Sequence, residues 1–274
     1  MERTAKNTAT RPFTAAGAKA GELDARVSRS LSARGRLAQR SSASRGNEGL
    51  ATVLSDLRRV AHTLELTAVG QKARIIGFTS AVPGEGVSTC IAAISYLLAS
   101  EGPTPLGRGQ TGSLPMQGQP LGAGNVVLVD ANIGDPSLNQ AFGMPMQPGL
   151  TEAISSPEPL SFARRAENAS LFVIPAGHRG RSALDPDRLR VTLQEIANHA
   201  RLVLVDLPSV LHSPEGVKLA GVCDALVMVV RANSTRWEAV AEARRLLERA
   251  GVPLLGAILN RRRFELPRWL YERL

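Results

Sequence analysis

A glycine-rich run carries the clearest chemistry in this chain. Gly84-Glu85-Gly86-Val87-Ser88-Thr89 follows a short apolar run and precedes a helical pattern. Glycine permits the sharp turn that such a run needs, and the following helix directs its positive end at an anion. The backbone N–H groups of all six residues are then available to phosphate oxygens. We therefore predict a phosphate-binding loop over these residues.

One position of this loop departs from the usual P-loop pattern, which ends in Gly-Lys followed by Ser or Thr. Val87 occupies the lysine position, so the loop lacks the ammonium that neutralises β- and γ-phosphate charge. No backbone group replaces a full positive charge. Ser88 keeps the hydroxyl that is expected to reach Mg²⁺. The sequence thus predicts ATP and Mg²⁺ as ligands, bound weakly or lost.

Two aspartates follow apolar runs of strand length. Asp130 ends Val126-Val127-Leu128-Val129-Asp130, and Asp206 ends Leu202-Val203-Leu204-Val205-Asp206. Ligands of open α/β sheets bind at the carboxyl ends of strands. One acid would orient a metal-bound water or an attacking hydroxyl, and the other would hold the outer shell of the metal. The candidate catalytic residues are therefore Asp130 and Asp206, and the candidate metal residues are Ser88, Asp130 and Asp206. The alternative is that each aspartate caps the turn after it.

Apolar runs alternate with helical patterns along most of the chain. The runs are apolar at consecutive positions, as expected of strands covered on both faces. The expected strands are Ile75–Thr79, Val126–Val129, Leu171–Ile174, Leu202–Val205, Ala225–Val230 and Leu255–Leu259. The expected helices are 49–68, Ser88–Ala99, Asp185–His199, Pro214–Ala220 and Arg236–Ala250. This order predicts an α/β fold, a mostly parallel central sheet with helices on both faces.

The charge of the chain lies near its two ends. The formal net charge is +9, of which residues 1–48 carry +6 and residues 261–274 carry +3. Residues 49–260 are thus close to neutral, so we expect no nucleic acid as a partner. Residues 1–48 are poor in large apolar side chains and are predicted to form a disordered basic tail. A lipid-attracted polybasic segment and a transit peptide are the alternatives for this tail.

The remaining organisation follows from composition. We expect one domain over 49–263, a Pro/Gly-rich insertion at 101–124 and an amphipathic tail at 264–274. No secretory signal or membrane-spanning run is evident, and Cys90 and Cys223 match no metal spacing. The chain is therefore expected to be cytoplasmic, and its basic tail leaves open a recruitment to the inner face of the cell membrane.

The motifs in their order resemble the cytoplasmic domain of the bacterial tyrosine kinases (BY-kinases). These are the capsular and exopolysaccharide autokinases of the MinD/ParA-like P-loop class. The resemblance covers about residues 50–263. It is carried by Ser80–Thr89, Val129-Asp130-Ala131-Asn132 with Pro136-Ser137-Leu138, Gly149–Ile154, Val173–Gly177, Val205–Leu211, Val229–Ala232 and Gly256–Arg261.

The resemblance implies a role for each matching position. Gly84 to Thr89 would be the Walker A motif, Asp130 the Walker A′ acid and Asp206 the Walker B acid. Asn260 and Arg261 would lie near the adenine. The implied fold is the three-layer P-loop NTPase sandwich of the MinD/ParA-like class.

The departures from the family pattern concern catalysis. Lysine is replaced by Val87, the second Walker A′ aspartate by Asn132, the basic residues after it by Gly134 and Asp135, and the threonine after Walker B by Leu207. The tyrosine cluster that the family autophosphorylates is also missing, with Tyr271 the remaining tyrosine near the end. These losses favour a degenerate kinase.

Three functional hypotheses follow from the resemblance. The first is a regulatory, catalytically weakened homologue in exopolysaccharide or capsule biosynthesis or export, working through a membrane chain-length determinant or copolymerase and open to homo-oligomer formation. The second is an active ATP-dependent tyrosine autokinase in which Arg108, Lys218 or an arginine of a neighbouring subunit supplies the missing charge. The third is a MinD/ParA-like ATPase.

Overall fold

The computed structural model describes residues 43–101, 124–166, 170–178 and 184–261. The chain divides into two units, 1–54 and 55–274, and the sheet lies in the second. Helix α2 spans Ala43–Gln71, so it begins inside the stretch predicted as a tail and extends beyond the predicted helix 49–68. The predictions for residues 1–42, for most of the insertion 101–124 and for the tail 264–274 lie outside the described residues.

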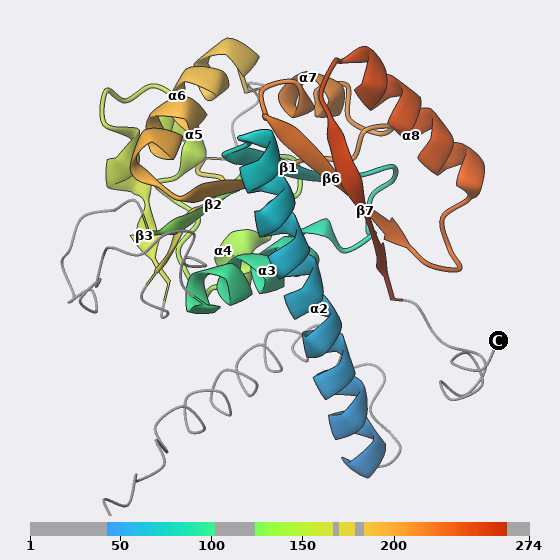
Figure 1. Ribbon diagram of the computed structural model, residues 1–274. Helices are drawn as coiled ribbons and strands as arrows, with labels where there is room; N and C mark the ends of the chain where they lie inside the picture. Colours follow the sequence, from blue (N-terminus) through green and yellow to red (C-terminus); the bar gives the residue numbers. More distant parts are fainter. Residues whose placement is uncertain (1–42, 102–123, 167–169, 179–183, 262–274) are drawn as a thin grey trace, which may run out of the picture. The chain divides into compact units, whose positions relative to one another are not determined.

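Seven strands of the described part form one sheet in the order β3-β4-β2-β5-β1-β6-β7. Strand β3 pairs antiparallel with β4, and the other neighbouring strands pair in parallel. The strands are β1 Ile75–Ser80, β2 Val126–Asp130, β3 Arg164–Arg165, β4 Leu171–Ile174, β5 Leu202–Asp206, β6 Ala225–Arg231 and β7 Leu254–Asn260. The predicted mostly parallel α/β sheet is confirmed (Figure 1).

The central strands are covered on both faces, which is why their sequences are apolar throughout. Every residue of β1, β2, β4 and β5 is buried. Alternate residues, such as Val127 and Val129, join the core beneath α6, α7 and α8. Figure 1 shows these helices on one side of the sheet and α3 on the other. The edge strand β7 is more exposed.

The predicted helices form with small shifts at their ends. They are α3 Val87–Glu101, α6 Pro186–His199, α7 Gly216–Ala220 and α8 Trp237–Arg249. Helix α6 begins one residue later than predicted because Asp185 is its N-cap, and the Asp185 carboxylate accepts the N–H of Asp187 at 3.0 Å. Pro186 fits the first helical position because it needs no N–H partner there.

Four short elements escape the sequence prediction. They are α4 Leu138–Ala141, α5 Leu150–Ala153, the 3-10 helix η1 Pro159–Phe162 and strand β3. Each has four residues or fewer. An element of that length is too short to show a hydrophobic period.

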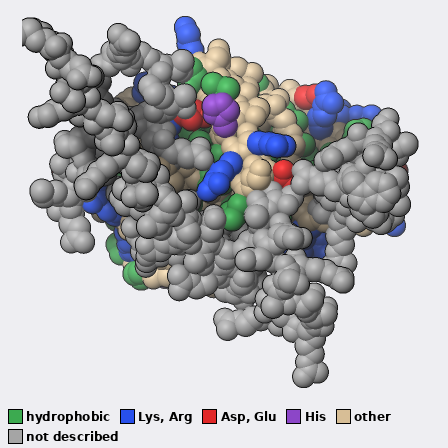
Figure 2. Space-filling view, turned by 60° about the horizontal axis from the view of Figure 1, so that its bottom comes forward, with side chains coloured by type: hydrophobic (Ala, Val, Ile, Leu, Met, Phe, Trp, Pro, Cys, Tyr) green, Lys and Arg blue, Asp and Glu red, His purple; other side chains and the backbone are tan. Residues whose placement is uncertain are grey.

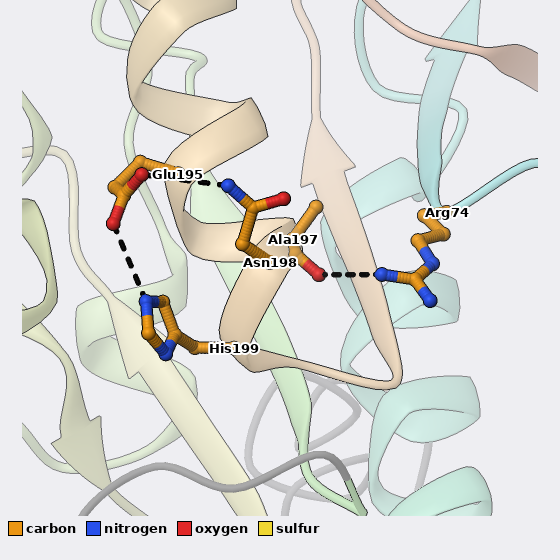
Figure 3. Close-up of polar contacts among 5 residues, drawn as sticks. All are labelled: Arg74, Glu195, Ala197, Asn198 and His199. Carbon is orange, nitrogen blue, oxygen red and sulfur yellow. Dashed lines mark hydrogen bonds and ion pairs between the residues drawn. The ribbon is translucent and has the colours of Figure 1, made fainter.

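Helix α6 ends against the start of β1, at the amino-terminal edge of the sheet. The guanidinium of Arg74 donates to the carbonyl of Ala197 at 3.3 Å (Figure 3). In the same turn, Glu195 accepts from Asn198 at 3.5 Å and lies 3.3 Å from the ring of His199. Figure 3 shows Glu195 and His199 on the side of the helix end away from Arg74, with Asn198 between them and Ala197. The contact from Arg74 satisfies a carbonyl group that the last helical turn leaves open.

A largely buried ion pair holds α2 at the same edge. Arg201, just before β5, contacts the carboxylate of Glu65 in α2, and the two side chains are 15% and 16% exposed. The guanidinium of Arg201 also donates to the carbonyl of Leu98 in α3 at 2.7 Å. One arginine therefore joins α2 and α3 to the start of a central strand.

The face in Figure 2 shows how charge is distributed over part of the described surface. Lys and Arg side chains stand there in separate small groups among apolar and uncharged atoms, and grey atoms cover the rest. On that visible part of the described surface the basic groups form no continuous area. This agrees with a net charge near zero for residues 49–260.

Candidate functional site

The glycine-rich loop joins the carboxyl end of β1 to α3, as predicted. Gly84 and Gly86 adopt positive φ values of 82° and 90°, which suit glycine. Helix α3 begins at Val87, and the N–H of Cys90 closes the first helical turn on the carbonyl of Gly86 at 3.0 Å. The N–H groups before Cys90 in that turn have no partner within the helix. The loop therefore has the backbone form of an anion-binding turn at a helix start.

Strand order places this loop at a reversal of the sheet. From β1 the chain crosses through α3 to β2 on the far side of β5, whereas from β5 it passes through α7 to β6 on the other side of β1. Connections that leave adjacent strands toward opposite faces open a crevice at the carboxyl ends of those strands. The ends of β1 and β5 thus form the expected ligand edge.

The lysine position of the loop is filled by an enclosed apolar side chain. Val87 is 9% exposed, while Ser88 and Thr89 are half-buried. The hydroxyl-bearing residues of the loop thus remain partly accessible next to a position without charge. Among the cations proposed as substitutes, Lys218 lies exposed in α7, and Arg108 lies outside the described residues.

Glu85 has a structural role that no pattern in the sequence indicates. Its side chain is 1% exposed. One carboxylate oxygen accepts the N–H of Val82 at 3.2 Å, and the other accepts the N–H of Arg231 at 3.1 Å and the hydroxyl of Thr235. The backbone carbonyl of Glu85 accepts the side-chain amide of Asn260 at 2.7 Å. Glu85 therefore ties the loop to the ends of β6 and β7.

Asn260 lies against the loop, and Arg261 follows it. The Asn260 amide nitrogen stands where a side chain on Gly86 would begin, 2.4 Å from the position of a Cβ there. Arg261 is exposed and has a positive φ of 57°. Asn260 thus contacts the phosphate loop directly. The placement of both residues near an adenine stays a prediction.

Asp130 holds the turn that follows its strand. One carboxylate oxygen accepts the N–H of Asn132, and the other accepts those of Ser137 and Leu138, each at 3.2 Å. Burial raises the pKa of Asp130 from 3.8 to about 6, against the opposing effect of these hydrogen bonds and with a further rise from Asp135. The capping alternative is therefore observed, and the metal and catalytic roles of Asp130 stay predictions.

Asp206 lies beside Asp130 at the same edge. The two residues are register partners across β2 and β5, and Asp206 also pairs in register with Phe78 of β1. Asp206 is fully buried. Among the described residues, no group of three or more His, Cys, Asp or Glu side chains is arranged to hold a metal ion. The two acids therefore lie at neighbouring strand ends beside β1, the strand that leads into the loop, and their metal role is still a prediction.

The thiol of Cys90 shows which charges surround the start of α3. Burial raises the pKa of Cys90 from 9.0 to about 12, while Arg261 lowers it and Asp206 raises it. The thiol is thus protonated at neutral pH and unsuited to act as a nucleophile. Arg261 and Asp206 both lie close enough to the first turn of α3 to act on it electrostatically.

Two motifs that are separate in the sequence pack together beyond β4. A Cβ on Gly149 would lie 2.2 Å from the carbonyl oxygen of Pro175, so this approach requires glycine. Glu152 accepts the N–H of Gly149 at 2.6 Å, the hydroxyl of Thr151 at 3.0 Å and the N–H of His178 at 3.1 Å. Partial burial alone would raise the pKa of Glu152, but these hydrogen bonds stabilise its charged form and lower the pKa overall. These contacts join the start of α5 to the residues that follow β4.

Comparisons with known proteins agree with the resemblance seen in the motifs. No known protein-family profile matches the sequence. The chain is 26% identical over 212 residues to the tyrosine-protein kinase YwqD of Bacillus subtilis, covering 74% of this chain and 78% of that protein. It is 28% identical over 142 residues to the tyrosine-protein kinase ptk of Acinetobacter johnsonii, covering 49% of this chain and 19% of that protein.

A third relative has a name that refers to polysaccharide transport. This is the succinoglycan biosynthesis transport protein ExoP of Rhizobium meliloti, 25% identical over 202 residues, which cover 70% of this chain and 23% of ExoP. The chain therefore spans about a fifth of the lengths of ptk and ExoP.

Solved structures share the fold. The VpsO kinase domain superposes with a TM-score of 0.62 at 22% identity, covering 79% of this chain and 98% of that one. The septum site-determining protein MinD of Pyrococcus horikoshii, solved with Mg-ADP, gives a TM-score of 0.52 at 16% identity, covering 73% and 76%. The predicted MinD/ParA-like P-loop fold is confirmed. No described helix has both the length and the apolar character that crossing a membrane requires.

Proposed function

We propose that this chain, a relative of the bacterial tyrosine-protein kinases, is a regulatory P-loop protein with weakened transfer chemistry. Its proposed setting is exopolysaccharide or capsule biosynthesis or export. The observation that carries the proposal is the enclosed Val87 in a loop whose backbone otherwise has the form of a phosphate site. Binding needs the backbone of such a loop, whereas phosphoryl transfer also needs the missing ammonium.

The described residues fit a nucleotide phosphate better than they fit catalysis. The positive φ values of Gly84 and Gly86 and the start of α3 support an anion at this turn. Ser88, Asp130 and Asp206 are the residues that would hold Mg²⁺, and a bound Mg²⁺ would neutralise phosphate charge. The carboxylate of Asp130 already accepts hydrogen bonds from three N–H groups, and this weakens it as a ligand for Mg²⁺.

The charge of the site favours the same conclusion. Asp130 and Asp206 are buried acids at the neighbouring ends of β2 and β5. In the Lys-containing pattern, an ammonium within the loop would offset part of this charge, and Val87 offers none. A triphosphate therefore enters a less favourable field here, so we expect weak binding that depends on Mg²⁺.

The proposed partner is a membrane chain-length determinant or copolymerase of a polysaccharide export system. The name of ExoP, a succinoglycan biosynthesis transport protein, supports a setting in polysaccharide export. The match covers 23% of the length of ExoP. The chain would act on the cytoplasmic side, recruited to the membrane through its partner. Self-association into a homo-oligomer belongs to the same proposal.

The deciding experiment compares nucleotide affinity in three proteins: wild type, Val87→Lys and Val87→Met. Titration calorimetry with ATP and Mg²⁺ should show weak binding by wild type. We expect Val87→Lys to bind about 10-fold to 100-fold more tightly, because a charged hydrogen bond contributes about 1.5–3 kcal/mol. Val87→Met adds length without charge and should bind like wild type. Robust ATP hydrolysis or tyrosine phosphorylation by purified wild type would overturn the proposal.

One observation favours the second candidate function, an active ATP-dependent tyrosine autokinase. Arg261 acts electrostatically on Cys90, in the first turn of α3, so a cation already lies near the loop. If wild type proves active, Arg261→Gln should abolish the activity and Arg261→Lys should retain part of it. Unchanged activity in Arg261→Gln, in Lys218→Gln and in Arg108→Gln would exclude each of these residues as the source of the missing charge.

A further inference from the structure

Glu85 is a buried acid that neither the phosphate contacts nor the metal role uses. Its side chain is 1% exposed, although it belongs to a loop whose Pro83 and Gly84 are exposed. Carboxylates are almost never fully buried unless they are paired. The partners of this one are the N–H of Val82 in its own loop and two groups from a distant segment. The buried carboxylate of Glu85 therefore joins two segments of the chain through hydrogen bonds.

The distant partners belong to the connection between β6 and α8. The N–H of Arg231, the last residue of β6, donates at 3.1 Å, and the hydroxyl of Thr235 donates to the same oxygen. Arg231 and Thr235 lie 146 and 150 residues from Glu85 along the sequence. Hydrogen bonds to a carboxylate are about twice as strong as neutral ones. The β6–α8 connection is thus held to the loop through one side chain.

The same side chain also holds the shape of its own loop. The other carboxylate oxygen of Glu85 accepts the N–H of Val82 at 3.2 Å, three residues earlier, so the acid bridges the turn. The hydrogen bond from Asn260 to the Glu85 carbonyl fixes the next peptide group. A Cβ on Gly84 would meet no atom within 4 Å, so the other side of the turn is open.

We propose that Glu85 is a positioning residue, which with Thr235 clamps the phosphate loop in its anion-accepting shape before any nucleotide binds. Movement of the β6–α8 connection would then change the affinity of the loop for phosphate groups. This inference rests on the proposed nucleotide binding for its consequence, but the clamp itself exists without ligand.

The experiment uses the full chain in four variants. Glu85→Gln removes the charge of the contact, Thr235→Val removes one of its donors, and Thr235→Ser keeps the hydroxyl. Ser234→Ala is the matched control, because Ser234 is the exposed neighbour of Thr235 and is not among the described residues that donate to the Glu85 carboxylate. Thr235→Val is the milder change, so it keeps the test decisive if Glu85→Gln folds poorly.

Two measurements separate the clamp from nucleotide binding. Hydrogen exchange of peptides covering residues 82–90, without ligand, should be faster in Glu85→Gln and Thr235→Val and unchanged in Thr235→Ser and Ser234→Ala. Affinity for ATP with Mg²⁺ should fall about 10-fold in Glu85→Gln, which loses the charge of the carboxylate, and about fivefold in Thr235→Val, which loses one of the hydrogen bonds to that carboxylate. Adenosine, which lacks phosphates, should bind all variants alike.

Each outcome decides one of the two claims. Unchanged exchange in both Glu85→Gln and Thr235→Val overturns the clamp, whatever happens to binding. Faster exchange with no measurable nucleotide binding by wild type or Val87→Lys supports the clamp and overturns the proposed function. An equal loss of affinity for adenosine and for ATP would show a general structural effect, and it would overturn the role of Glu85 toward phosphate.

Discussion

The side-chain amide of Asn260 donates a 2.7 Å hydrogen bond to the backbone carbonyl of Glu85, which joins the end of β7 to the phosphate loop. The residues lie 175 positions apart in the sequence. The family resemblance predicts that Asn260 lies near a nucleotide base, and the structure shows its amide nitrogen engaged by the loop. If that prediction holds, one residue connects the base side of the site with the phosphate side.

Gly86→Ala should destabilise the protein more than Gly84→Ala. Both positions have positive φ, which costs a residue with a Cβ about 1 kcal/mol. A Cβ at Gly86 would also meet the Asn260 amide nitrogen at 2.4 Å, whereas one at Gly84 would meet no atom within 4 Å. We expect a loss of about 2–3 kcal/mol for Gly86→Ala, because the Asn260 hydrogen bond is lost as well. Urea unfolding measures both.

The double variant Gly86→Ala/Asn260→Gly supplies the control for this prediction. Removing the Asn260 side chain relieves its overlap with the new Cβ at position 86. Asn260→Gly should therefore cost less stability in the Gly86→Ala protein than in wild type. Equal costs in the two backgrounds would show that Asn260 does not limit this position.

Arg201→Met should cost much more stability than Arg244→Met. The Arg201–Glu65 pair is largely buried, and Arg201 also donates to the carbonyl of Leu98. Removing one partner of a buried pair costs about 3–5 kcal/mol. The Arg244–Glu248 pair of α8 is exposed, and such pairs contribute about 0–1 kcal/mol. Chemical denaturation of both variants tests the difference, and similar losses would contradict the bridging role of Arg201.

The parts of this protein that depend on local pattern can be predicted from its sequence. Runs such as Val126–Val129 are apolar at every position because both faces of their strands are covered, so composition alone identifies them. The glycine positions of the loop are equally local, since positive φ restricts the residue type. The structure confirms the strands to within a residue or two at their ends.

The contacts that sequence cannot predict are those between distant segments. In the sequence Glu85 is one more backbone donor of the loop, because its partners Arg231 and Thr235 are brought to it by the pairing of β1 with β6. No period or spacing in the sequence predicts contacts between residues so far apart. From the sequence alone, capping is one of two alternatives for Asp130, the other being a catalytic or metal role. The sequence does not show that the N–H groups of Ser137 and Leu138 point at its carboxylate.

Glu152→Gln should lower stability at neutral pH by about 1 kcal/mol, as expected when a hydrogen-bonded carboxylate is lost. The hydrogen bonds of Glu152 lower its pKa below the ordinary 4.5 in the folded protein. Its contribution is therefore present above pH 4.5 and is lost as pH falls through the lower folded pKa. Unfolding curves from about pH 7 to about pH 3 should show wild type and variant converging. A constant gap over this range would contradict the assignment.

Asp130→Asn should show the opposite dependence on pH. The pKa of Asp130 rises from 3.8 to about 6 on folding, because burial disfavours its charged form. The folded state then binds more protons than the unfolded state between these values, so stability falls as pH rises through this window. This rise in the pKa of Asp130 corresponds to about 3 kcal/mol. Wild type should therefore lose stability relative to Asp130→Asn by up to that amount between about pH 4 and about pH 7.

Carboxyl NMR provides an independent measurement of the same group. The Asp130 signal of the folded protein should titrate with a midpoint near 6. Asp135→Asn should move that midpoint down, because the Asp135 charge contributes to the raised pKa of Asp130. A midpoint near the ordinary 3.8 in wild type would mean that the N–H groups of Asn132, Ser137 and Leu138 stabilise the carboxylate enough to cancel its burial. Asp130 would then already be charged at about pH 5.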